Sequence, residues 1–194
     1  MDYKKRITSP EKVWSRSEIL LSPSPVPKES GVYGWYFKNF PAIIPTENCV
    51  TLNNLTLLYI GISPKSPPQN GKPPSSQRLF HRVRYHMTGN AEGSTLRLTL
   101  GCLLSENLGI QLRRVGSGNR LTFADGEQKI SQWLAENAFV TWVSCNKPWE
   151  LESDLLSELS LPLNLDQNRN HNFHSILSGL RKSARERAKE LPIV

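Results

Sequence analysis

The sequence predicts an α+β fold, with strands and helices mixed and without the regular strand–helix–strand alternation of a parallel sheet. Three short runs rich in aromatic and β-branched residues are typical of strands and lie at 31–37, 55–62 and 139–144. Between and after them, apolar residues recur at spacings of three or four, which indicates helices. The chain of 194 residues, 38% of them hydrophobic, is long enough to build one domain with its own core.

The N-terminal third of the chain combines an arm, two strands and a long loop. Residues 1–30 are polar with scattered prolines, so we expect a loosely packed arm with a short helix near 13–21. The first two strands, GVYGWYF and LTLLYIGI, are joined by a connection that contains prolines. Residues 63–77 contain five prolines and one glycine, which excludes regular structure and predicts an exposed loop.

A helix is predicted directly after this loop, because its apolar side chains recur at every fourth position; the seam consists of Leu79, Val83 and Met87. Ser75 or Ser76 is available to cap its start, and Gly89 ends it. An insertion of about residues 89–136 follows. It is predicted to contain a helix over 95–108, a hairpin over 110–123 and a helix over 127–137.

Two further helices are predicted after the third strand. The first covers 148–159 and is capped by Asn146, and the last is a basic amphipathic helix over 173–191. The expected organisation is therefore an arm at 1–30, a main domain at 31–172 and a C-terminal basic helix at 173–194.

Charge and cysteine content restrict the classes of function. Lys and Arg number 24 against 17 Asp and Glu, and the region 78–120 holds seven arginines with only two acids. The net charge of +7 favours a polyanionic partner, although a merely soluble basic protein has the same balance. Three widely spaced cysteines argue against a disulfide framework and a structural zinc site. No secretory signal and no run long enough to span a membrane is evident, so we expect a cytoplasmic setting and no membrane partner.

One carboxylate lies where a core-facing leucine is expected. When the helix at 148–159 is projected at about 100° per residue, Glu152 falls in the middle of the apolar stripe of Leu155, Leu156 and Leu159. The other acids of this helix, Glu150, Asp154 and Glu158, fall on the opposite face. A core-facing carboxylate is costly unless a cation or good donors compensate it. We therefore expect a metal ion, an arginine or both beside Glu152; a structural Glu–Arg pair or a position at the helix rim is the alternative.

Basic and aromatic side chains form two further candidate groups. Arg78, Arg82 and His86 make one stripe on the helix after the loop, where arginine forks and an imidazole would clamp a phosphate. The alternative is a solvated basic face. Tyr33 and Tyr59 lie in the first two strands, each near a glycine that allows close approach of a ligand or of another backbone. Ordinary packing is the alternative for both tyrosines.

The ordered set of these residues resembles the GIY-YIG nuclease family. Gly31-Val32-Tyr33 is similar to the first signature of the family, and Tyr59-Ile60-Gly61 matches the second. Arg82 and His86 fit the Arg-x-x-x-His motif of its first core helix. Glu152 resembles its metal-binding glutamate, and Asn164, twelve positions later, the asparagine that follows it.

The resemblance covers roughly residues 31–164, with all six diagnostic positions in order. It implies a small three-stranded antiparallel sheet flanked by helices, to which this chain adds the inserted helix and hairpin. Two departures concern substrate geometry: the spacing of 23 between Tyr59 and Arg82 is long, and the insertion is large.

The resemblance also implies a metal-dependent endonuclease that hydrolyses a phosphodiester bond in DNA. Glu152 would hold Mg²⁺ or Mn²⁺, and Tyr33 would act as general base on the attacking water. A nearby cation and Arg82 would lower the pKa of this phenol, and Tyr59 would be hydrogen-bonded beside it. His86 would orient a tyrosine or protonate the leaving group, and the sequence leaves both roles open.

The roles of the remaining polar residues are less specific. Asn164 would support the glutamate or a metal-bound water, unless it is only a turn residue. Further contacts to DNA are expected from basic residues beside the clamp, on the hairpin and on the C-terminal helix: Arg78, Arg113, Arg114, Arg120, Arg181, Lys182, Arg185 and Lys189. A packed capping helix and a solvated hairpin are the alternative.

Two other readings of the whole chain remain open. A nucleic-acid-binding module of the same fold without turnover would keep the basic surface but has no need of a core-facing carboxylate. A component that relies on a protein partner for targeting is the third reading, and the identity of any protein partner is open.

Overall fold

A curled antiparallel sheet of five strands forms the centre of the computed structural model, which describes residues 2–68, 70, 73 and 75–194. The three long strands are those that the sequence predicts: β2 (Gly31–Phe37), β4 (Leu55–Ser63) and β7 (Ala138–Ser144). Their neighbours in the order β1-β7-β2-β4-β3 are β1 (Trp14–Ser15) and β3 (Thr51–Leu52). The expected number of three strands is therefore wrong. Strands of two residues are too short to show the alternation by which a strand is recognised.

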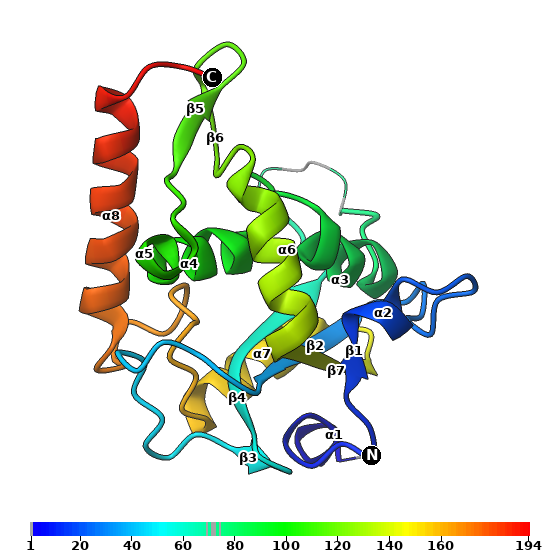
Figure 1. Cartoon of the computed structure of the whole chain (residues 1–194). Helices are drawn as coiled ribbons and strands as arrows, with labels where there is room; N and C mark the ends of the chain where they lie inside the picture. Colours follow the sequence, from blue (N-terminus) through cyan, green and yellow to red (C-terminus); the bar gives the residue numbers. More distant parts are fainter. Residues whose placement is uncertain (1, 69, 71–72, 74) are drawn as a thin grey trace.

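The N-terminal segment packs against this sheet. It contains α1 (Tyr3–Thr8), β1 and α2 (Arg16–Ile19), and β1 pairs with β7 (Figure 1). Ile7 and Ile19 are fully buried, so the loosely packed arm expected from the polar composition is not observed. One isoleucine per short helix fixes the segment to the core, and a composition dominated by polar residues hides such single anchors.

The helices and the hairpin occur in the predicted order. They are α3 (Leu79–Thr88), α4 (Thr95–Leu103), α5 (Ser105–Leu108), β5 (Arg113–Val115), β6 (Arg120–Thr122), α6 (Gly126–Asn137), α7 (Pro148–Glu158) and α8 (His174–Glu190). The long helix expected over 95–108 is divided at Leu104 into α4 and α5. In Figure 1, α8 stands beside α4 and α5, and the hairpin of β5 and β6 reaches the end of the chain.

The apolar seam of α3 is confirmed, and two helix caps are not. Leu79, Val83 and Met87 are all fully buried, and Gly89 follows the last residue of the helix. The N-cap position of α3 is Arg78 and that of α7 is Lys147, in each case without a side-chain cap bond. The serine and Asn146 that the sequence predicts as N-caps therefore lie one or more residues before the observed N-caps. The N-cap position is set by the backbone conformation at the start of the helix, and serine or asparagine is only a frequent residue there.

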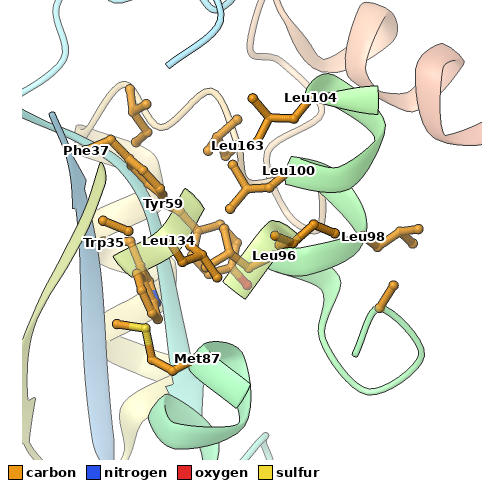
Figure 2. Close-up of a cluster of buried hydrophobic side chains, with 14 of the residues drawn as sticks. Trp35, Phe37, Tyr59, Met87, Leu96, Leu98, Leu100, Leu104, Leu134 and Leu163 are labelled. Atoms are coloured by element: carbon orange, nitrogen blue, oxygen red, sulfur yellow. The ribbon is translucent and has the colours of Figure 1, made fainter. Parts of the chain in front are cut away.

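Alternate side chains of β2 enter two separate cores, because successive residues of a strand point to opposite faces. Tyr33, Trp35 and Phe37 join the cluster under α3, α4 and α6, part of which is drawn in Figure 2. Val32 and Tyr36 join the cluster that contains Leu155 and Leu156 of α7. Helix α3, which carries Arg82 and His86, packs on the face of the sheet that carries Tyr33.

The remaining expectations concern membranes and thiols. None of the described helices is long and apolar enough to cross a membrane. All three cysteines are free thiols, in agreement with the absence of a disulfide framework predicted from their spacing.

Candidate active site

Two glycines of the paired strands make room for the central groups of the site. A Cβ atom at Gly31 would collide with the carbonyl oxygen of Val143 on the neighbouring strand β7. A Cβ atom at Gly61 would collide with the hydroxyl group and ring of Tyr33, its antiparallel partner across β2 and β4. The glycines of the two signatures are thus required by close packing, and Gly61 creates the space in which the Tyr33 hydroxyl lies.

The Tyr33 hydroxyl is part of a buried hydrogen-bonded chain. It lies 2.8 Å from Nε2 of His86, and Nδ1 of His86 lies 2.7 Å from the hydroxyl oxygen of Ser94. Tyr33, His86 and Ser94 are at most 1% exposed. The ring of Trp35 contacts the imidazole edge-on, with centroids 5.8 Å apart. The imidazole is therefore held at both nitrogens, and of the three residues of the polar stripe on α3 it is the one that is fully buried.

The inserted segment supplies the support of His86. Ser94 caps α4 by accepting a hydrogen bond from the backbone N–H of Arg97 at 3.1 Å. The guanidinium of Arg97, which is fully buried, donates to the backbone carbonyl of His86 and forms a salt bridge with Glu127 at 2.7 Å. Sequence reasoning missed these three residues. A serine before a predicted helix was the only available sign, because Arg97 and Glu127 are thirty positions apart.

Arg82 and Tyr59 lie beside this chain. The Arg82 guanidinium donates to the backbone carbonyl of Gly93 at 2.6 Å, and its charge acts on both Tyr33 and Tyr59. The Tyr59 hydroxyl is 3.4 Å from that of Thr95, which is a long contact for two hydroxyl groups. Arg78 is separate from Arg82: it lies with Ser30, Ser144 and Asn146 around another depression at the ends of β2 and β7.

Burial determines the protonation of the central pair. It raises the pKa of Tyr33 well above its usual value, and the charge of Tyr59 adds to this rise. The Arg82 charge lowers the same pKa, as expected, but does not outweigh burial. Burial also lowers the pKa of His86 well below its usual value, and the charges of Arg82 and Arg97 act in the same direction. The phenol and the imidazole are therefore both neutral at neutral pH.

Glu152 occupies α7 as the helical projection predicts. Its carboxylate is partly buried, whereas Glu150, Asp154 and Glu158 are exposed. Burial raises the pKa of Glu152 to about 7, the charge of Asp166 contributes in the same direction, and Lys65 opposes them. The charge of Glu152 also contributes to the raised pKa values of Tyr33 and Tyr59, so α7 brings it close to the tyrosines.

The surroundings of Glu152 fit a hard divalent cation. Within the part of the chain that the structure describes, no hydrogen bond or ion pair reaches its carboxylate, so the structural Glu–Arg pair is not observed there. The same residues contain no group of three side chains suited to hold a metal. A single uncompensated carboxylate is compatible with Mg²⁺, which keeps several waters and takes further oxygens from substrate phosphates.

Asn164 has partners other than those expected. Its side-chain oxygen accepts a hydrogen bond from the backbone N–H of Ile60 at 3.0 Å, and its side-chain nitrogen donates to the Ile60 carbonyl at 2.9 Å. The side-chain amide thus makes the two hydrogen bonds that the backbone of a neighbouring strand would make with β4. One more such bond follows along the same edge, where the backbone N–H of Leu163 donates to the carbonyl of Leu58. Asn164 fixes the strand that carries Tyr59 and contacts neither Glu152 nor Tyr33 by a hydrogen bond.

Two of the hairpin arginines are engaged with the end of α8. Arg114 donates to the backbone carbonyls of Ala188 and Leu191, and Arg113 donates to that of Pro192. Such donors satisfy the carbonyls that a helix leaves free at its C-terminal end. Arg120 remains exposed, so it is the hairpin residue that is available to a ligand.

The basic residues of α8 fall on two sides of the helix. Arg181 and Arg185 are partly buried and line a groove, whereas Lys182 and Lys189 are exposed outside it. The four cations predicted as one surface are therefore two pairs in different surroundings.

Comparison with models of protein families matches residues 31–183 to the GIY-YIG catalytic domain. The matched range covers most of the chain and includes all six catalytic candidates. Neither the comparison with curated proteins nor that with solved structures gave a match.

Proposed function

Because the chain belongs to the GIY-YIG catalytic domain family, we propose that it is a metal-dependent endonuclease that hydrolyses a phosphodiester bond in DNA. One observation carries this proposal: the buried Tyr33 hydroxyl lies over the glycine of the second signature, is paired with His86, and is acted on by the charges of both Arg82 and Glu152. A fold kept only for binding has no need of these groups in one place.

The candidate cofactor is Mg²⁺ or Mn²⁺, held by Glu152. When bound, such a cation polarises a phosphate oxygen and stabilises the oxygen that leaves. Glu152 suits this task because its partly buried carboxylate forms no hydrogen bond or ion pair with the residues that the structure describes, and the charge of Lys65 only partly offsets burial and the neighbouring Asp166. A cation and a substrate phosphate would supply the compensation.

Tyr33 is the proposed general base for the attacking water. Because burial keeps both groups neutral before the reaction, Tyr33 would accept the proton of the water as it passes its own proton to His86 Nε2, which lies 2.8 Å away. The Ser94 hydroxyl oxygen then accepts the N–H of Nδ1, which selects the tautomer with a free lone pair on Nε2. Among the two roles left open by the sequence, the geometry supports the one in which His86 orients and assists the tyrosine.

Arg82 is the proposed phosphate clamp. Its guanidinium is anchored by the carbonyl of Gly93 and reaches the surroundings of both tyrosines. A planar fork of N–H groups is suited to the developing charge on a phosphate. The fixed anchor holds this fork in place before the substrate arrives, which is the condition for electrostatic stabilisation of a transition state.

The proposed setting is a reducing, cytoplasmic one, which the three free thiols support. Incubation of the purified chain with supercoiled, branched and single-stranded DNA in Mg²⁺ or Mn²⁺ tests the function. We expect cleavage of at least one substrate and none in excess chelator. Binding without cleavage of any substrate under these conditions would instead support the non-catalytic module of the same fold.

A further inference from the structure

An open groove of about 660 Å³ lies between the segment after Asn164 and the face of α8 that carries His174, Ser178, Arg181 and Arg185. Its lining includes Asp166, Gln167, His174, Ser178, Arg181 and Arg185. Pockets of roughly 300–1,000 Å³ enclose a molecule of a few dozen atoms. A groove of this volume accommodates one or two nucleotides of a single strand.

Two arginines of α8 line this groove. Arg181 and Arg185 are partly buried one turn apart on α8, and no ion pair to either side chain occurs among the residues that the structure places. The Nε atom of Arg181 is buried and has no hydrogen-bond partner in this part of the chain. Burial and then the charge of Arg185 lower the pKa of Arg181. Two guanidinium groups held in this way are stabilised by an anion that binds between them.

The groove adjoins the candidate active site through the segment that forms one of its walls. Its lining begins at Leu165, directly after Asn164, whose side-chain amide is hydrogen-bonded to the backbone of Ile60 between Tyr59 and Gly61. Arg181 interacts with both Asp166 and Tyr59. A phosphate bound by Arg181 and Arg185 would thus lie in the groove that adjoins the strand carrying Tyr59.

We propose, on the basis of the proposed function, that this groove binds a single DNA strand adjacent to the phosphate that is cleaved. Arg181 and Arg185 bind its phosphates. The Gln167 amide and the Ser178 hydroxyl supply donors and acceptors for exposed base edges, and the His174 ring supplies a flat face for stacking. Basic groups combined with stacking and amide groups are typical of sites for unpaired strands.

The test compares two double variants of the full chain. Arg181→Gln with Arg185→Gln removes the two groove cations of α8 and leaves the exposed Arg169, the third arginine of the lining, in place. Lys182→Gln with Lys189→Gln removes the same charge from the exposed side of the same helix. Fluorescence anisotropy measures binding, without divalent metal, to a single-stranded oligonucleotide, a duplex with a single-stranded arm and a blunt duplex. Arg185→Gln alone is included in case the double groove variant is unstable.

For the groove variant we expect roughly tenfold weaker binding to the single strand and to the armed duplex, with a salt slope reduced by about 1 to 1.5 for two lost phosphate contacts. On the blunt duplex, the groove variant should lose no more affinity than the lysine variant loses. An equal loss on the blunt duplex would show that the groove follows a strand of intact DNA and would overturn the proposal. No loss, or the same losses in both variants, would also overturn it.

Binding and cleavage separate this proposal from the function on which it rests. If the wild type cleaves DNA but the groove variants bind normally, only the groove assignment fails. If the wild type binds single strands through the groove but cleaves nothing with Mg²⁺ or Mn²⁺, only the catalytic assignment fails.

Discussion

At the scale of single residues, the absence of a side chain at Gly61 decides where the Tyr33 hydroxyl lies. The hydroxyl occupies the space that a Cβ atom would fill, and from there it reaches His86. The glycine itself takes no part in chemistry. Its contribution is to leave room for the ring of Tyr33 to lie across the neighbouring strand β4. In the sequence Gly61 is only part of a motif, and the structure shows that close packing is the reason for it.

We therefore expect Gly61→Ala to lower the turnover rate strongly, by about 100-fold, the scale for displacing a catalytic group by an ångström. The added methyl group also costs about 1–3 kcal/mol of stability through overpacking. Gly179→Ala is the matched control, because no atom lies within 4 Å of the added Cβ there. Single-turnover cleavage and thermal unfolding measure both effects. Normal turnover of a folded Gly61→Ala protein would show that the position of Tyr33 is not critical.

Ser94 joins two functions in one hydroxyl group, since it caps α4 and holds His86. We expect Ser94→Ala to lose about 1 kcal/mol of stability as a lost helix cap and, in addition, to lower the turnover rate and shift its pH profile, because His86 loses its orienting partner. Ser15→Ala removes the comparable cap of α2, whose hydroxyl group bonds, among the residues that the structure describes, only to Ser17 and Glu18 of its own helix, and should affect stability alone. Equal turnover for the two variants would assign Ser94 a purely structural role.

At the scale of elements, α7 carries a carboxylate, Glu152, whose burial against the sheet destabilises the folded protein when it is charged. The helix buries Leu155 and Leu156 against the sheet, and Glu152 lies on the same side with a pKa raised to about 7. In the unfolded chain the pKa is near its usual value of 4.5. The folded state therefore binds the proton more tightly, and its stability falls as the pH rises from about 4.5 to about 7.

Glu152→Gln should thus stabilise the metal-free protein above pH 7, by on the order of 1–3 kcal/mol, and hardly change its stability near pH 4.5. The exposed Asp154→Asn on the same helix should be silent at both values. Mg²⁺ should raise the melting temperature of the wild type and not that of Glu152→Gln. Chemical and thermal unfolding measure these differences. A wild type that is as stable as Glu152→Gln at pH 8 without metal would contradict the uncompensated charge.

At the scale of the whole molecule, the sequence predicts the parts that depend on local pattern. Strands β2, β4 and β7 follow from runs of aromatic and β-branched residues, and the seam of α3 and the position of Glu152 on α7 follow from helical periodicity. The parts that were missed depend on contacts between distant residues. Ile7 and Ile19 anchor a polar segment, the Asn164 amide pairs with the edge of β4, and Arg97 with Glu127 supports His86 from within an insertion.

The sequence also could not predict which basic residues pack against the protein and which line the groove. Arg113 and Arg114 look like ligand-binding residues until the end of α8 is placed beside them. Spacing on α8 puts Arg181, Lys182, Arg185 and Lys189 on one basic helix, but only the packing of the segment after Asn164 separates the groove pair from the exposed pair.

The cleavage of DNA by Glu152→Gln tests the central claim most directly. Wild type, Glu152→Gln and Asp154→Asn are compared with the preferred DNA substrate in Mg²⁺, and binding is measured in parallel. We expect wild type and Asp154→Asn to cleave at similar rates, and Glu152→Gln to bind DNA normally and cleave none. Cleavage by Glu152→Gln at nearly the wild-type rate would contradict the account.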